Sequence, residues 1–258
     1  MGGHLPMAAG IGYGIRLRGT DQVCLCFFGD GAINEGAFHE ALNVSGLWDL
    51  PVVYIIENNR YGMGTSIDRA SSVKDLYQRA SAYGVPRREV NGMDVVAVRN
   101  AMGEAIERAR KEKRPTLIEA ETYRYRGHSM SDPGKYRTKE EVEQMMKSDP
   151  ILLFGRRLME QERFTQADLD GIDKEVLAQM DDAVAFTEQS PEPSAESLYE
   201  DVYVRSPYIH ANADKDPAWR AARREDRVPE KLPPWTPPAP QPAEAPPAPE
   251  AAASGKAK

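Results

Sequence analysis

The chain has 258 residues, 41% of them apolar, which is enough to build one α/β domain with a sizeable core. Its formal net charge of −7 argues against non-specific binding to nucleic acid. No apolar run approaches the length of a membrane span, and the first residues lack the basic segment and apolar core of a signal peptide. We therefore expect a cytoplasmic protein that acts without nucleic acid or membrane.

Two apolar segments early in the chain each end in a polar cluster. Residues 23–28 lead into the Gly-Asp-Gly sequence at 29–31, and residues 51–56 lead into the Glu-Asn-Asn sequence at 57–59. Each apolar run predicts a short buried strand. Ligands bind at the carboxyl ends of the strands in open parallel sheets, so we expect both clusters to line a site.

The residue types in these clusters are typical of a magnesium and diphosphate site. Asp30 supplies a carboxylate and the pair Asn58–Asn59 an amide oxygen, and Mg²⁺ prefers such oxygens together with phosphate and water. Gly29 and Gly31 lack a Cβ, so the backbone can approach a phosphate closely. The Gly-Asp-Gly sequence alone is equally typical of a tight turn, but the two clusters together favour the diphosphate site.

A helix is predicted between the two clusters, from Glu35 to Leu47, with Asn34 as its cap. The free amides at its start would favour an anionic ligand. Its apolar stripe consists of Phe38, Ala41 and Leu42, with Ser45 beside them.

The two cysteines, Cys24 and Cys26, alternate on the first predicted strand. Their side chains point the same way and are too far apart to bridge easily. Without further cysteine or histidine ligands nearby, a zinc site is also excluded. We expect small buried side chains in a reducing compartment.

Strand and helix patterns alternate further along the chain. A strand is predicted at 85–91 and another at 116–120, and Asp94 is a candidate cap for the helix between them. That helix carries a stripe of core positions: Val95, Val98, Met102, Ala105, Ile106 and Ala109. The alternation predicts an α/β fold, a parallel sheet flanked by helices on both faces.

The loop from Tyr123 to Arg137 has two interpretations. It can be a polar surface connection in which Arg124, Arg126 and Arg137 are solvated charges. Alternatively, His128, flanked by basic residues beyond a strand end, can serve a phosphate or an oxyanion.

Three segments resemble one protein family. The sequences at 29–31, 57–66 and 122–134 are similar to those of the α subunit of pyruvate dehydrogenase, the thiamine-diphosphate-dependent decarboxylating component of the 2-oxo acid dehydrogenase complexes. The resemblance covers residues 1–203 and implies a thiamine-diphosphate-binding fold.

The resemblance also implies roles for particular residues. Asp30, the side chain of Asn59 and the main-chain carbonyl of Tyr61 would bind Mg²⁺, and Gly31 and Ala32 would line the diphosphate through their backbone. The loop histidine of the family corresponds to His128, which would lie near the diphosphate and the reacting thiazolium ring as a catalytic residue. The carbanion chemistry itself belongs to the cofactor.

The implied activity is the oxidative decarboxylation of pyruvate, with transfer of the acetyl group to the lipoyl group of dihydrolipoyl acetyltransferase. The family builds each cofactor site between two chains, so the implied partner is a β subunit, in a heterotetramer of two α and two β subunits. Two alternatives stay open: a branched-chain 2-oxo acid or acetoin dehydrogenase α subunit, and a catalytically incomplete assembly subunit. The sequence of residues 128–134 resembles that of the pyruvate-specific members of the family and so favours pyruvate as the substrate.

The sequence departs from the family at two points. Relatives have an amino-terminal region, with arginine and tyrosine contacts to the diphosphate, before the point where the match begins at Met1. We expect a misplaced start, a split gene or a shortened subunit, and assign no role to His4. Relatives that are regulated by kinases carry a phosphorylatable serine shortly after the Asp-Pro-Gly turn. Here Lys135 and Tyr136 directly follow Gly134, so we expect an unphosphorylated loop of bacterial type.

The last part of the chain is predicted to be helical and then unstructured. A capping box is expected at 138–141 and a cap at Asp149–Pro150. Thr165 would open a long helix. Its stripe, expected to be core or subunit contact, consists of Leu169, Ile172, Val176, Met180 and Val184. Ten of the twenty prolines lie in 229–249, which predicts a disordered Pro/Ala-rich tail over 204–258, either a docking or spacing element or an inert end, after a domain at 1–203.

Overall fold

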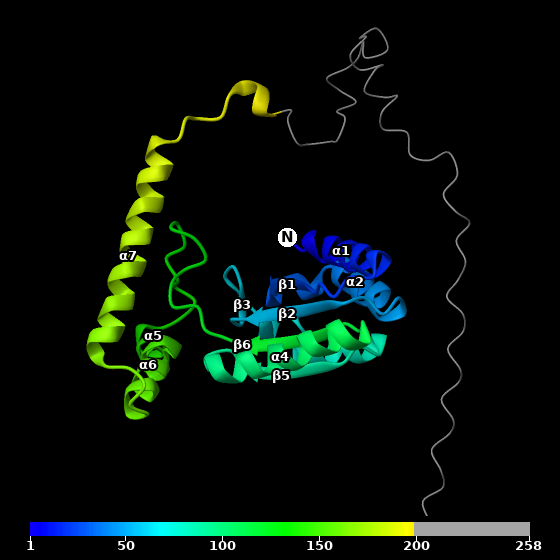
Figure 1. Cartoon of the computed structure of the whole chain (residues 1–258), viewed down its shortest axis with the longest axis horizontal. Helices are drawn as coiled ribbons and strands as arrows, with labels where there is room; N and C mark the ends of the chain where they lie inside the picture. The colour runs from blue at the N-terminus through cyan, green and yellow to red at the C-terminus, as the bar shows by residue number, and fades with distance from the viewer. Residues whose placement is uncertain (199–258) are drawn as a thin grey trace, which may run out of the picture. The chain divides into compact units, whose positions relative to one another are not determined.

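The first unit of the chain is built around a four-stranded parallel sheet (Figure 1). The computed structural model describes residues 1–198, and Met1–Asp182 form a compact unit. The strand order is β1-β2-β6-β5. The strands are β1 (Cys24–Gly29), β2 (Val52–Asn58), β5 (Arg87–Asn91) and β6 (Thr116–Glu121). All three pairings are parallel, so the predicted strands and the parallel sheet are confirmed. The predicted domain boundary at 203 and the tail 204–258 lie outside the described residues.

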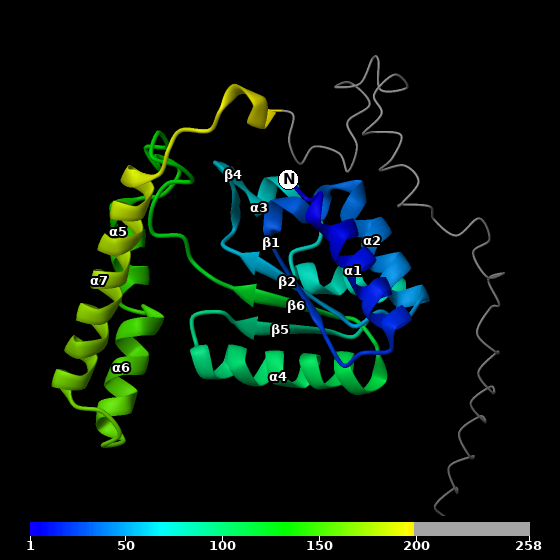
Figure 2. The same ribbon diagram turned by 45° about the horizontal axis from the view of Figure 1, so that its top comes forward.

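Helices cover both faces of the sheet, as predicted. On one face lie α1 (His4–Arg18) and α2 (Gly36–Leu47), and on the other lies α4 (Val95–Glu112) (Figure 2). The predicted stripe of α2 is confirmed, because Phe38, Ala41, Leu42 and Ser45 are all buried.

The two faces have separate cores because side chains alternate along each strand. Cys26 and Phe28 of β1 belong to the core beneath α1 and α2, whereas Val53 and Ile55 of β2 belong to the core beneath α4. Leu25 and Phe27 pair in register with Val53 and Ile55 and so lie on the side of α4. They are 42% and 50% exposed, because β1 is the edge strand and α4 packs on its neighbours.

The predicted cap and most of the stripe of α4 are confirmed. Asp94 accepts hydrogen bonds from the N–H groups of Val96 and Ala97 at 2.9 and 3.1 Å. Ala105 and Ala109 are buried, and Val98, Met102 and Ile106 pack against the same core. Val95 is 47% exposed, so its assignment to the core is wrong; it lies in the first turn, beyond the reach of the sheet.

The prediction that Asn34 caps the helix after the first cluster is wrong. A short 3-10 helix, η1 (Asp30–Asn34), follows β1 directly, so α2 begins only at Gly36 after an extended Glu35. The side chain of Asn34 instead accepts a hydrogen bond from Arg79 at 2.9 Å.

Small elements follow β2 at the carboxyl edge of the sheet. They are β3 (Tyr61–Gly62), β4 (Thr65–Ser66) and α3 (Ile67–Ala70), and after them the 3-10 helix η2 (Leu76–Tyr83) packs against α2, β5 and β6. The antiparallel hairpin β3–β4 contacts η1.

The remaining described elements are α5 (Lys139–Met146), α6 (Pro150–Glu160), α7 (Gln166–Gln189) and η3 (Ala195–Leu198). Thr138 caps α5 and Asp149 caps α6, as predicted. The capping box is only half formed, because the carboxylate of Glu141 accepts from the hydroxyl of Tyr123. No helix within residues 1–198 is long and apolar enough to cross a membrane.

The stripe of α7 is not a core of this part of the chain. Ile172, Val176, Met180 and Val184 are each about half exposed, from 48 to 57%. The alternative prediction, a contact with another subunit, stays a prediction.

Candidate functional site

The first turn after β1 and the end of β2 come together at the carboxyl edge of the sheet. Asp30 begins η1, and the hairpin β3–β4 returns over it. A Cβ added to Gly31 would lie 3.5 Å from the Cα of Gly62, and a Cβ added to Gly62 would lie 3.4 Å from the Cα of Gly31. The hairpin that follows the second cluster therefore contacts the first cluster, and the two clusters themselves are neighbours in the sheet, where Gly29 pairs with Glu57. This confirms that the sheet brings both clusters to one edge.

Asp30 is a buried carboxylate with an unsatisfied oxygen. It is 1% exposed, and its Oδ2 has no hydrogen-bond partner within residues 1–198. Burial raises the pKa of Asp30, although the N–H groups of Asp30 and Asn59 and the positive charge of Arg124 oppose this shift. A buried carboxylate oxygen without a donor is unfavourable unless a cation satisfies it.

The other two predicted magnesium ligands lie on the turn beside Asp30. Arg60 has a left-handed backbone (φ 68°), and the Oδ1 of Asn59 accepts a hydrogen bond from the N–H of Tyr61 at 3.3 Å. The carbonyl of Tyr61 accepts a long contact of 3.4 Å from Arg124. One carboxylate, one amide oxygen and one carbonyl suit Mg²⁺, which usually takes its remaining ligands from phosphate and water. Residues 1–198 contain no group of three or more His, Cys, Asp or Glu that could hold a metal instead.

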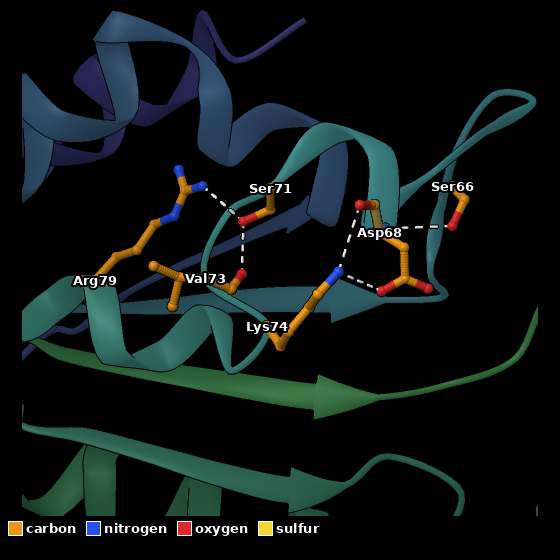
Figure 3. A network of polar contacts seen from close by, with 6 residues as sticks. All are labelled: Ser66, Asp68, Ser71, Val73, Lys74 and Arg79. Atoms are coloured by element: carbon orange, nitrogen blue, oxygen red, sulfur yellow. Dashed lines mark hydrogen bonds and ion pairs between the residues drawn. The ribbon is translucent and has the colours of Figure 1, made fainter.

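The turn after Asp30 is anchored from η2 through Arg79, whose bond to Ser71 is drawn in Figure 3. The guanidinium of Arg79 donates to the carbonyl of Ile33 at 2.8 Å and to Ser71 Oγ at 2.8 Å. Ser71 in turn donates to the carbonyl of Val73 at 2.6 Å. This network fixes η1, and with it the position of Gly31 and the buried Ala32.

Arg124 connects the hairpin to the loop that follows β6, a role the sequence did not reveal. Its guanidinium donates to the carbonyl of Met63 at 2.6 Å and to the hydroxyl of Tyr136 at 2.7 Å. The solvated-charge interpretation is therefore wrong for Arg124. The feature of the sequence that could have indicated this role is the position of Arg124 just after a strand, at the same edge of the sheet as Asp30.

The interpretation as a solvated charge is also wrong for Arg137, whereas it holds for Arg126. The guanidinium of Arg137 lies 5.2 to 5.6 Å from the ring centres of Tyr61, Tyr123 and Tyr136, a favourable cation–π geometry. Arg126 is exposed, and its one hydrogen bond among the described residues is through its carbonyl, which accepts from Arg137 at 2.8 Å.

The loop that carries His128 is organised around Asp132. Asp132 accepts from the N–H of His128 at 2.7 Å, the N–H of Gly134 at 2.9 Å and the hydroxyl of Tyr136 at 2.7 Å. These donors, with the backbone donor of His128 first, lower the pKa of Asp132 to about 2. A Cβ on Gly127 would lie 2.3 Å from the carbonyl oxygen of Asp132, so the turn requires a glycine.

The structure does not bring His128 to the other predicted site residues. His128 is exposed, and within residues 1–198 no hydrogen bond joins its side chain to Asp30, Asn59 or Tyr61. The connection is indirect and runs through Asp132, Tyr136 and Arg124. His4, to which no role was assigned, contacts the carbonyl of Phe27 at 2.9 Å.

An apolar cavity of about 780 Å³ lies elsewhere in the unit, between the start of α4 and the helices α6 and α7. Val95, Ile151 and Leu169 are among its lining residues, and none of the predicted site residues lines it. The volume of this cavity is therefore not an argument for the predicted site, which lies at the carboxyl edge of the sheet. The two cysteines are free, as predicted, and burial raises the pKa of Cys26 to about 11.

The fold and the polar edge define an α/β protein whose candidate site lies at the carboxyl ends of a parallel sheet. A family model described as dehydrogenase E1 component matches residues 1–196, and the chain belongs to this family. It is 47% identical over 203 residues to the pyruvate dehydrogenase E1 component subunit alpha of Rhizobium meliloti, covering 78% of this chain and 58% of the relative. The predicted resemblance is confirmed.

Other relatives carry the same name. The subunit of Rickettsia felis is 43% identical over 203 residues, covering 79% of this chain and 62% of the relative. The somatic mitochondrial form of Bos taurus is 44% identical over 209 residues, covering 80% of this chain and 53% of the relative. The chain thus spans between 53 and 62% of the length of these three relatives.

Proposed function

We propose that this chain carries the Mg²⁺- and diphosphate-binding part of a pyruvate dehydrogenase α subunit. Its substrate would be pyruvate, its cofactor thiamine diphosphate, and its acetyl acceptor the lipoyl group of a dihydrolipoyl acetyltransferase. The names of the relatives support this proposal. The observation that carries it is Asp30, a buried carboxylate with an unsatisfied oxygen, on a turn whose glycine contacts a second glycine loop.

The residues of the edge suit such a cofactor. Asp30, the side chain of Asn59 and the carbonyl of Tyr61 would hold Mg²⁺, while the backbone at Gly31 and Ala32 would lie along the diphosphate. Thiamine diphosphate, when bound, supplies the carbanion chemistry of the decarboxylation. Bound Mg²⁺ would also remove the penalty that burial imposes on the Asp30 carboxylate.

The loop residues would serve the reacting end of the site. We assign His128 to proton transfer near the thiazolium ring, as the family motif implies. Asp132 holds the main chain of His128 by a 2.7 Å hydrogen bond, and Arg124 joins this loop to the hairpin. The imidazole is exposed in this chain, so the proposal requires a β subunit to enclose it, in a heterotetramer of two α and two β subunits.

A cytoplasmic location belongs to the same proposal. Both cysteines of the chain are free thiols, which agrees with a reducing compartment.

The test is pyruvate-dependent dye reduction by this chain co-expressed with its β subunit, with thiamine diphosphate and Mg²⁺ supplied. Asp30→Asn should abolish the activity and weaken Mg²⁺-dependent cofactor binding. The matched control is Asp21→Asn, which alters an exposed carboxylate and should leave both unchanged.

Three results would contradict the proposal or part of it. Full activity of Asp30→Asn would remove Asp30 from the site. Turnover of branched-chain 2-oxo acids or acetoin in preference to pyruvate would support the alternative substrates. An inactive complex that still assembles would support the catalytically incomplete assembly subunit.

A further inference from the structure

A second buried carboxylate, Glu119, lies close to the candidate metal site and has no part in the function proposed above. It is the fourth residue of β6 and is 2% exposed, between strand neighbours that are themselves buried. Its side chain lies on the same face of the sheet as Leu117, where η2 packs on β6. A buried charge is energetically unfavourable unless it is fully hydrogen-bonded. The hydrogen-bond partners of Glu119 therefore indicate its role.

The carboxylate of Glu119 has two partners, one on each oxygen. Oε1 accepts from the side-chain Nδ2 of Asn58 at 2.7 Å, and Oε2 accepts from the main-chain N–H of Tyr77 at 2.8 Å. The first bond determines the orientation of the Asn58 amide, because only the NH₂ group can face a carboxylate.

The orientation of Asn58 in turn determines the geometry of the next turn. With Nδ2 held by Glu119, the Oδ1 of Asn58 accepts from the N–H of Arg60 at 3.0 Å. Arg60 has a left-handed backbone, which is unfavourable for a residue with a side chain and needs such support. This turn places the side chain of Asn59 and the carbonyl of Tyr61 beside Asp30.

We infer that Glu119 is a positioning residue for the metal-binding turn: through Asn58, its carboxylate fixes the left-handed Arg60 backbone that presents Asn59 and Tyr61 to Mg²⁺. This inference rests on the proposed function, because that function makes Asn59 and Tyr61 ligands. Groups behind metal ligands typically change metal affinity by about 10- to 100-fold when they are altered.

The pair Glu119 and Asn58 allows a swap that separates positioning from general stability. In Glu119→Gln the new side chain has one acceptor for two donors, so one of the three hydrogen bonds is lost in any orientation. In Asn58→Asp two carboxylates face each other. In the double variant, the amide oxygen of the side chain at 119 accepts from the main-chain N–H of Tyr77, and its NH₂ group donates to the carboxylate at 58. The other oxygen of that carboxylate accepts from the main-chain N–H of Arg60. All three bonds and the net charge are restored.

The first measurement is the Mg²⁺ concentration that gives half-maximal thiamine diphosphate binding by the complex with the β subunit, determined by calorimetry. Each single variant should raise it by about 10- to 100-fold, and the double variant should return it to within about threefold of the wild type. The matched control is Glu112→Gln, which removes an exposed carboxylate at the end of α4 and should leave the value unchanged.

The second measurement, amide hydrogen exchange at Arg60 without cofactor, does not depend on the function. Exchange should be faster in each single variant and slow again in the double variant. Lower thermal stability in the single variants with an unchanged Mg²⁺ requirement would overturn the inference and leave Glu119 a structural anchor. Failure of the double variant to restore both readouts would also overturn it. If the wild type binds no thiamine diphosphate with Mg²⁺, the proposed function fails and takes the metal role of Glu119 with it, whereas the exchange at Arg60 still reports on the turn.

Discussion

At the scale of single residues, His128 and Asp30 differ in burial: the side chain of His128 is exposed, whereas that of Asp30 is buried. His128 lies on a loop whose turn is held by Asp132, so its imidazole can change without disturbing a core. Asp30 lies at the junction of β1 and η1 with an unsatisfied oxygen. Substitutions at the two positions should therefore separate chemistry from binding.

His128→Ala should lower turnover much more than cofactor binding. Loss of a positioned proton-transfer group typically reduces the rate by about 10²- to 10⁴-fold, whereas the proposed Mg²⁺ ligands stay in place. Steady-state kinetics and thiamine diphosphate titration of the complex with the β subunit would measure both effects. Met130→Ala is the control, because that side chain is fully exposed on the same loop. An unchanged turnover number in His128→Ala would remove the histidine from the mechanism.

Asp30→Asn should stabilise the protein in EDTA while it weakens Mg²⁺ binding. Burial raises the folded-state pKa of Asp30 above its usual value of 3.8, so the ionised carboxylate opposes folding at neutral pH. We expect Tm to rise by about 2–4 °C, which corresponds to about 1 kcal/mol for a domain of this size.

The gain from Asp30→Asn should depend on pH in a defined direction. Above the folded-state pKa the wild type carries the full penalty, so the difference in Tm is largest there. As the pH falls through that pKa, the folded state takes up a proton and the difference shrinks; below 3.8, where the carboxyl group is protonated in both states, the difference disappears. Thermal melts between pH 4 and 8 would measure it; a lower Tm for the variant at neutral pH would show that Asp30 is not an uncompensated charge.

At the scale of elements, the strands could be predicted from the sequence, but the side chains that join them could not. The apolar runs before Asp30 and Asn58 predicted β1 and β2, because a short continuous apolar run bounded by turn residues is typical of a strand, although only β2 is buried on both faces. Glu119 and Arg124 looked like ordinary charged residues. Their partners, Asn58 and Met63, are about sixty residues away in the chain, a separation that no local pattern encodes.

The helix α1 contains three glycines with different surroundings, and these test how it packs on the sheet. A Cβ on Gly12 would lie 2.5 Å from Cγ2 of Val52 and 3.2 Å from Cβ of Leu50, both fully buried residues. Gly10 and Gly14 have nothing within 4 Å of such a Cβ.

Gly12→Ala should therefore lower the free energy of unfolding by about 1–3 kcal/mol, as overpacking does. Gly10→Ala and Gly14→Ala should raise it by about 0.5–1 kcal/mol, because alanine is the better helix former. Urea denaturation of the three variants would measure the differences. Equal effects at all three positions would show that α1 does not pack closely on β2.

At the scale of the whole molecule, β1 is the edge strand of the sheet, and none of the helices within residues 1–198 covers one of its faces. Leu25 and Phe27 are about half exposed on the side of α4, whereas Phe28 is 4% exposed beneath α1 and α2. Neighbouring exposed apolar side chains on a strand are typical of a surface that another segment or chain covers. The sequence could not show this, because β1 reads as apolar at every position.

The double variant Leu25→Ser with Phe27→Ser should change the stability of the isolated chain by less than Phe28→Ser alone. Truncating a buried aromatic side chain costs about 3–5 kcal/mol, whereas half-exposed side chains lose only part of their burial. Thermal melts of the isolated chain and of its complex with the β subunit would compare the two variants. If the double variant is stable alone but weakens the complex, the β subunit covers this face of β1. If it is as unstable alone as Phe28→Ser, the two side chains are buried in the isolated chain, and the expected difference between the two faces of β1 is wrong.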